Sequence, residues 1–308
     1  KFWKLNMSSV SYVIPVFNKS KFLKPVINSL KSQNGSFKKE YIFIDDGSTD
    51  QSYKILRKET KGLKNCFILR QKNRGSANAT NQGIKKAKMK YIKFLDADDL
   101  ILRDSTKILM EILEKNSSCV LAYGLQRKVN NIENVDLNEK IENYDIELIR
   151  KPIMLAMRNS MFNPSQFLAK TDICKSVGGC DERIKFSQEY SLTLKLSKIG
   201  SFIKINYPIA ILPFSAPGQI SEKKNNQIFR VSKALELFIK ENYDLPVKIR
   251  LYAQRRLTAR AWRFARNNKI KNLYFKYFIL YLIGLLRINI QLLKVCRQAN
   301  KIYEPFLD

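Results

Sequence analysis

The first half of the chain alternates short apolar runs with segments in which apolar residues return at helical spacing. The runs are continuous rather than alternating with polar residues, which is typical of strands in a parallel sheet covered on both faces. In the segment over residues 19–33, Phe22, Val26 and Leu30 share one helical face. The pattern predicts strands over residues 10–17, 41–45, 66–70, 91–96 and 119–124, and helices over 19–33, through Leu56, ending near Lys88, and over about 104–115.

Strands that alternate with helices predict an α/β fold with a Rossmann-like, mostly parallel sheet flanked by helices. Ligands bind such sheets at the carboxyl ends of the strands. Beyond it, residues 130–149 are polar with six acidic side chains and are interpreted as a connecting excursion. Residues 187–200 have apolar residues at alternate positions, yet their length and the terminal Gly200 favour a helix. One or two short strands are expected over residues 201–212.

The character of the chain changes over residues 245–303, which hold fourteen Lys or Arg and no Asp or Glu. The apolar core of this segment, residues 277–286, is too short for a bilayer span, which needs about twenty residues. Basic residues beside Phe, Tyr, Trp and Leu fit a helix that lies on an anionic membrane surface. A helical tail packed on the rest of the protein, an oligomer contact and, less favoured, nucleic-acid binding are the alternatives.

The amino-acid composition limits which partners, catalytic residues and metal sites the protein can have. The formal net charge is +29, which attracts polyanions, although an AT-rich genome would also enrich Lys, Asn and Ile. There is no histidine, and the five cysteines are irregularly spaced, so His-based catalysis and Cys/His zinc sites are excluded. Buried free thiols in a reducing cytosol are the better interpretation. No apolar run with a cleavage site opens the sequence, so no secretory signal is predicted, and Met7 is a possible natural start.

Acidic residues nevertheless gather where two predicted strands end. Asp45 and Asp46 follow one strand, and Asp96, Asp98 and Asp99 follow another in the string "YIKFLDADDL". Like charges this close repel one another unless a cation joins them. Because parallel strands end at one edge of a sheet, the two groups should meet there and form a site for a metal ion and phosphate.

These motifs, taken in order, carry a family resemblance. The strings "SYVIPVFN", "IFIDDGSTD", "NRGSANATNQGI", "YIKFLDADD", "VGGCDERI" and "QEYSLTLKL" resemble the family 2 glycosyltransferases of GT-A fold, over residues 9–221, about two thirds of the chain. The resemblance implies transfer of a sugar from a nucleotide diphosphate sugar to an acceptor hydroxyl, with inversion. A departing diphosphate needs its charge neutralised, so Mn²⁺ or Mg²⁺ is the expected cofactor.

The resemblance also implies roles for particular residues. Asp98 is the expected metal ligand, and Asp96, placed on the same side if the segment is extended, would contact the ribose or a metal-bound water. Asp46 would contact the nucleobase. The expected donor-binding residues are Pro15, Phe17, Asn18, Asp46, Lys72, Asn73, Arg74, Asp96, Ala97 and Asp98. Simpler interpretations remain: Asp45 and Asp46 as helix caps, and the loop around Arg74 as a solvated basic segment.

An inverting enzyme needs a general base for the acceptor hydroxyl. The family commonly has Glu-Asp where this chain has Gln188 and Glu189, so Glu189 is the expected base; an acid that only stabilises a helix N-terminus is the alternative. Thr80 stands where arginine is common. A histidine that can complete the metal shell is missing near Ala216, so the metal would be held mainly by Asp98, diphosphate and water. The QxxRW signature of processive synthases is absent, so one sugar per encounter is expected.

The sequence thus predicts a GT-A catalytic domain over residues 1–225, with a nucleotide-binding half at about 9–125 and an acceptor-side half at about 150–221, and a basic helical region over 226–308. The predicted function is transfer from a UDP-sugar to a glycan or lipid-linked glycan in bacterial surface polysaccharide or lipopolysaccharide synthesis. The protein would be cytoplasmic and peripheral on the inner membrane face, and possibly homo-oligomeric. An inactive polyanion-binding scaffold and a sugar-phosphate nucleotidyltransferase are the alternatives.

Overall fold

The computed structural model describes residues 8–184, 188–214, 224–271, 274–289 and 291–306. Its centre is a nine-stranded sheet in the order β3-β2-β1-β4-β8-β6-β9-β5, with β7 paired to β9. The first four strands in this order run parallel: β3 (Cys66–Arg70), β2 (Lys38–Asp45), β1 (Ser9–Val16) and β4 (Tyr91–Phe94). The predicted parallel sheet is therefore present, and β1, β2 and β4 end at one edge.

The second half of the sheet is mixed. β8 (Phe167–Lys170) is antiparallel to both β4 and β6 (Cys119–Val129), while β9 (Ser201–Pro213) is parallel to β6. The last two strands, β5 (Leu100–Ile101) and β7 (Ile146–Ile149), pair antiparallel with β9. The excursion predicted over residues 130–149 thus ends in an edge strand, and the one or two short strands expected after residue 200 are one long strand.

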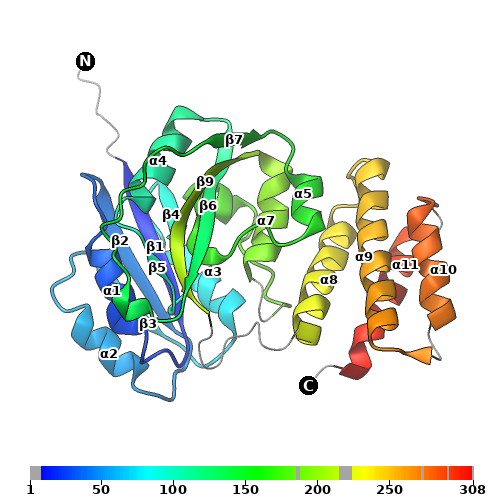
Figure 1. Cartoon of the computed structure of the whole chain (residues 1–308), viewed down its shortest axis with the longest axis horizontal. Coiled ribbons are helices and arrows are strands. Elements are labelled where there is room, and N and C mark those ends of the chain that lie inside the picture. The colour runs from blue at the N-terminus through cyan, green and yellow to red at the C-terminus, as the bar shows by residue number, and fades with distance from the viewer. Residues whose placement is uncertain (1–7, 185–187, 215–223, 272–273, 290, 307–308) are drawn as a thin grey trace.

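Helices cover both faces of the sheet (Figure 1). One apolar cluster lies beneath α1 (Leu23–Lys31), α2 (Ser52–Glu59) and α4 (Ser105–Lys115). The cluster on the opposite face lies beneath α3 (Ser76–Lys86), α6 (Thr171–Ser176) and α7 (Gln188–Ile199). Continuous apolar strands are explained by this two-sided burial.

The alternating pattern of α7 has a physical reason. Leu192 and Leu196 belong to the cluster beneath the sheet, whereas Tyr190 and Leu194 belong to a third cluster formed with the C-terminal helices. A helix packed on two sides has no single polar face, so its sequence loses the usual helical period. The helix predicted over residues 187–200 is confirmed as α7, which lies between the sheet and the C-terminal helices.

The C-terminal part is a bundle of α8 (Lys224–Glu241), α9 (Val247–Asn267), α10 (Tyr274–Leu285) and α11 (Leu292–Asn300), followed by a 3-10 helix (Lys301–Phe306). Its apolar cluster continues into α5 (Ile153–Arg158) and α7, and Figure 1 shows the bundle beside these two helices. The basic segment therefore packs on the sheet-containing part through apolar contacts. Among the described residues, no helix has the length and apolar character needed to span a membrane.

Candidate active site

The acidic residues after β4 form a turn, not an extended segment. The Asp99 amide donates to the Asp96 carbonyl at 3.1 Å, which closes the turn. Strand alternation therefore does not apply to Asp96 and Asp98, because this local hydrogen bond replaces the extended backbone that the expectation assumed. Asp98 and Asp99 are buried, and Asp96 is half-buried. We call residues 96–99 the acid turn.

Lys19 and Ser165 hold the acid turn, and Lys93 holds the segment that carries Ser165. Lys19, in the loop after β1, places Nζ 2.7 Å from Asp98 Oδ2. The Ser165 hydroxyl donates to Asp99 Oδ2 at 2.6 Å and accepts from the Asp96 amide at 3.0 Å. Lys93, fully buried in β4, donates to the carbonyls of Phe94, Ser165 and Phe167. The turn is fixed from both sides before any ligand arrives.

The negative charge of the turn is not fully compensated. Burial, and then the charges of Asp98 and Glu189, raise the pKa of Asp96 to about 8, although Lys19 and Lys93 oppose the shift. Burial, and then the charges of Asp98 and Asp96, raise the pKa of Asp99 well above its usual range. Burial lowers the pKa of Lys93 to about 7. A further cation at this edge of the sheet would relieve the repulsion.

Glu189 lies at the start of α7 and faces the acid turn. Its charge raises the pKa of Asp96, which places the two carboxyl groups within electrostatic reach of each other. Pro15 and Glu189 line the same small cavity. Burial raises the pKa of Glu189 to about 7, and the Ser160 hydroxyl donates to its Oε1 at 3.4 Å. The structure thus brings Glu189 near the acid turn, although about ninety residues of sequence separate them.

The first loop carries Phe17 and Asn18 at the same edge. The Phe17 side chain is 44% exposed, and Asn18, at φ 52°, uses its Oδ1 to accept the Thr49 amide at 2.8 Å. Asn18 therefore pins the loop after β1 to the loop after β2. Phe17 is left free to lie beside a planar ligand.

Asp46 holds the basic loop in place. Its carboxylate accepts hydrogen bonds from Gln71 Nε2 at 2.7 Å and from the Arg74 and Gly75 amides, each at 2.9 Å. Gly75 has φ 90°, a left-handed conformation that glycine adopts without strain. Lys72, Asn73 and Arg74 are exposed at this edge. The preceding residue, Asp45, forms an ion pair with Arg70 at 3.0 Å.

Several site residues escaped the sequence analysis. Lys19 and Ser165 contact the acid turn from 79 and 66 positions away along the chain, and neither stands in a motif. Glu182 accepts Asn78 Nδ2 at 2.6 Å and Asn81 Nδ2 at 2.9 Å, which joins α3 to the loop before α7. One sequence feature could have indicated Ser165. Lys93 stands alone in the apolar string "YIKF", and a buried lysine needs hydrogen-bond partners, of which the Ser165 carbonyl is one.

The carboxylate oxygens of the acid turn suit a hard divalent cation that takes few ligands from the protein. Among the described residues, no three His, Cys, Asp or Glu side chains are placed to hold a metal ion together. The acid turn offers carboxylate oxygens, which Mg²⁺ and Mn²⁺ prefer, and carries excess negative charge. Asp98, with Asp96 beside it, fits a metal completed by diphosphate and water. The described cysteines are free, and Cys174 and Cys180 are buried among apolar residues. The side chain of Gln188 and all of Ala216 lie outside the described residues.

Comparison with known proteins settles the family. The model of the family described as glycosyl transferase family 2 matches residues 11–174, more than half of the chain. This chain belongs to glycosyl transferase family 2. The family resemblance that the sequence motifs carry is thereby confirmed.

Relatives of this family 2 chain include polysaccharide synthases. It is 29% identical to chondroitin synthase of Escherichia coli over 64% of this chain and 28% of that protein. It is 34% identical to poly-beta-1,6-N-acetyl-D-glucosamine synthase of Staphylococcus epidermidis over 39% of this chain and 29% of that protein. The matches thus span less than a third of either relative's length.

Among solved structures, S. aureus TarS 1–349 in complex with UDP-GlcNAc aligns over 97% of this chain and 91% of that chain. The TM-score is 0.68 at 16% sequence identity. The alignment includes the C-terminal helices, and it confirms the expected GT-A fold with a helical C-terminal region.

Proposed function

We propose that this family 2 chain is an inverting, metal-dependent glycosyltransferase that moves a sugar from a UDP-sugar to a hydroxyl of a glycan or lipid-linked glycan. Bacterial surface polysaccharide or lipopolysaccharide synthesis is the setting we infer. The observation that carries the proposal is the meeting of Glu189 with the acid turn at the edge where β1, β2 and β4 end. Displacement at a sugar carbon needs a base on one side and charge neutralisation of the leaving diphosphate on the other.

Asp98 and Asp96 would hold the divalent cation, which when bound supplies positive charge to the departing diphosphate. Lys19 sets a fixed ammonium against the same carboxylate, so it orients Asp98 and lowers the repulsion within the turn. Lys72 and Arg74, exposed on the loop that Asp46 anchors, add mobile positive charge for phosphate oxygens. Asp99 keeps the turn closed through Ser165.

Glu189 takes the proton of the acceptor hydroxyl. A pKa of about 7 leaves a useful fraction of carboxylate at neutral pH and makes that carboxylate a stronger base than a solvated one. Ser160 and the backbone amides of Glu189 and Tyr190 contact this carboxylate and hold it at the start of α7.

Phe17, Asn18 and Asp46 frame the nucleobase in this proposal. An ionised carboxylate has about four acceptor positions, and the loop occupies three of those on Asp46, so one remains for a uracil N–H. The exposed ring of Phe17 lies at the same edge and offers a stacking surface.

Replacing Phe17 by Ala should weaken UDP binding about tenfold, because base–aromatic stacking contributes roughly 1–3 kcal/mol. The unliganded melting temperature should change little, since 44% of the side chain is exposed. Thermal shift titrations with UDP and UDP-GlcNAc in Mn²⁺, against ADP and GDP, measure both quantities. Phe275→Ala, which removes a 75% exposed ring on α10, is the matched control. Equal shifts with all nucleotides, or none with UDP, contradict the proposed donor.

We further infer that α10 attaches the enzyme to an anionic membrane surface. Tyr274, Phe275, Ile279 and Leu285 of this helix expose large apolar side chains, as does the adjoining Leu286. Lys276 and Arg287 lie in the same stretch. Exposed apolar side chains beside basic ones fit the boundary between headgroups and acyl chains.

Replacing Phe275 and Leu286 together by Ser should reduce co-sedimentation with phosphatidylglycerol-containing vesicles at least tenfold. Two large apolar side chains would no longer enter the bilayer, and each contributes about 1.5–3 kcal/mol when fully buried. Leu155→Ser, on α5 and 39% exposed, is the control and should sediment like the unaltered protein. Equal binding by all three proteins would refute α10 as the contact.

A further inference from the structure

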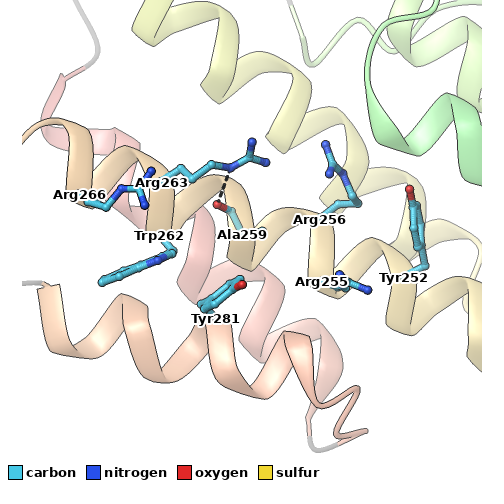
Figure 2. A pocket seen from close by; sticks show the side chains of 8 residues that line it. All are labelled: Tyr252, Arg255, Arg256, Ala259, Trp262, Arg263, Arg266 and Tyr281. Carbon is cyan, nitrogen blue, oxygen red and sulfur yellow. Dashed lines mark hydrogen bonds between the residues drawn. The ribbon is translucent and has the colours of Figure 1, made fainter.

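Five arginines lie along one side of α9 and form what we call the arginine ridge: Arg255, Arg256, Arg260, Arg263 and Arg266. A pocket of about 420 Å³ lies on the α10 side of the ridge, lined also by Trp262 and Tyr281 (Figure 2). A second pocket of about 630 Å³ lies toward α8 and the segment after α5. Arg256 and Arg263 line both pockets, so the ridge separates two adjoining hollows.

The ridge carries concentrated positive charge without neighbouring acids in its own segment of the chain. The hydrogen bonds of Arg256 and Arg263 go to neutral oxygens, including the Arg158 carbonyl at 2.6 Å and the Ala259 carbonyl at 3.3 Å. The buried Nε of Arg256 has no partner in the described part of the chain. Burial, and then the charges of Arg260 and Arg263, lower the pKa of Arg256. A bound anion would offset the positive charge of these guanidinium groups, as a bound cation would offset the negative charge of the acid turn.

The larger pocket includes the segment that contacts Glu189. Asn159 and Ser160 line it, and the Ser160 hydroxyl donates to Glu189 Oε1. Arg256 contacts the same segment, at 3.4 Å from Asn159 Oδ1. Arg260 ties it to α9 through the carbonyls of Met157 and Arg158, both at 3.2 Å. Glu189 itself lines the small cavity beside Pro15, so a molecule in the larger pocket would be separated from the base by Ser160.

Phosphate is the anion that this arrangement fits best. Guanidinium groups present paired N–H donors that match phosphate oxygens, and they recognise them with defined geometry. Aromatic rings at Tyr252, Trp262 and Tyr281 line the smaller pocket and can cover the apolar faces of a sugar or carrier. Successive arginines along α9 suit a ligand with more than one phosphate.

We propose that the arginine ridge is an acceptor subsite that binds phosphate carried by the acceptor and so holds its reactive hydroxyl near Glu189. The phosphate belongs either to a soluble phosphodiester polymer or to the diphosphate of a lipid carrier. The role as an acceptor subsite rests on the proposed transferase function, whereas phosphate binding at the ridge can be measured without sugar transfer.

Trp262 supplies a local reporter. The chain has two tryptophans, and Trp3→Phe leaves Trp262 alone. In this background, fluorescence is titrated with pyrophosphate, with a soluble poly(glycerol phosphate) oligomer, and with phosphatidylcholine vesicles with or without phosphatidylglycerol. We expect saturable changes with the soluble phosphates. Arg263→Gln should weaken them at least tenfold, whereas Arg297→Gln, which removes an exposed charge on α11, should change them less than twofold. Arg266→Gln replaces Arg263→Gln if that variant fails to fold.

The outcomes separate the alternatives. Saturation by pyrophosphate alone supports a diphosphate carrier, and saturation by the oligomer supports a polymeric acceptor. A response only to phosphatidylglycerol vesicles, no saturable response, or equal weakening by Arg263→Gln and Arg297→Gln overturns the proposal. Failure of every UDP-sugar to turn over would instead refute the proposed function, and it would leave the fluorescence titration unchanged.

Discussion

Glu189→Gln should lower kcat for sugar transfer by about 10²–10⁴-fold and leave the donor Kd unchanged. Removing a general base costs this much because the acceptor proton then has no recipient in the transition state. Glutamine keeps the size of the side chain and can still meet Ser160, so the fold should persist. Steady-state kinetics with UDP-sugar and acceptor measure kcat, and titration of the donor measures Kd.

The pH profile gives an independent check. Burial raises the pKa of Glu189 to about 7, so the base is available above that pH and is lost as the pH falls through it. Transfer by the unaltered enzyme should therefore rise as the pH passes through about 7, while Glu189→Gln should keep only the later rise that belongs to Asp96, whose pKa is about 8. Glu189→Asp should keep part of the activity, because the family commonly places aspartate here. Normal transfer by Glu189→Gln would show that another group is the base.

The placement of the acidic motifs could be predicted because it follows from topology. Continuous apolar strands implied a parallel sheet, and parallel strands end at one edge, so Asp46 and Asp96 were expected at the same edge, where β1 lies between their strands. The backbone of the acid turn could not be predicted in this way. Its conformation depends on one hydrogen bond from Asp99 to Asp96 and on Ser165, which lies in the 3-10 helix (Pro164–Gln166) before β8.

Side chains that reach the site from distant loops were the main omission. Lys19 looked like one more basic residue in a chain with 56 of them, and only the fold shows that it pairs with Asp98. The arginines of α9 were interpreted as part of a membrane-binding face for the same reason. Charge totals do not tell which cations converge, whereas the structure places Arg256 beside the segment that contacts Glu189.

Asp98→Asn should abolish the Mn²⁺-dependent part of donor stabilisation and reduce kcat/KM for transfer about 10³-fold. A bound cation that neutralises the leaving diphosphate contributes several kcal/mol in the transition state, and each 1.36 kcal/mol corresponds to a factor of ten. Removing metal from the unaltered enzyme with a chelator should reduce its kcat/KM to that of the variant. The variant itself should then respond neither to EDTA nor to added Mn²⁺.

The control for Asp98→Asn must lose a carboxylate without touching the acid turn. Glu111→Gln on α4 does so, since Glu111 is exposed and only 4.0 Å from Lys107 in an i,i+4 pair. It should keep full metal dependence. Asp98→Asn also leaves Lys19 without its partner, and removing one side of a half-buried ion pair lowers stability. Thermal melts without ligand therefore show whether the variant has lost only metal binding or has also become less stable. If Asp98→Asn retains Mn²⁺-dependent UDP-sugar binding, the cation lies elsewhere, and the acid turn serves only to hold Lys19 and Ser165 in place.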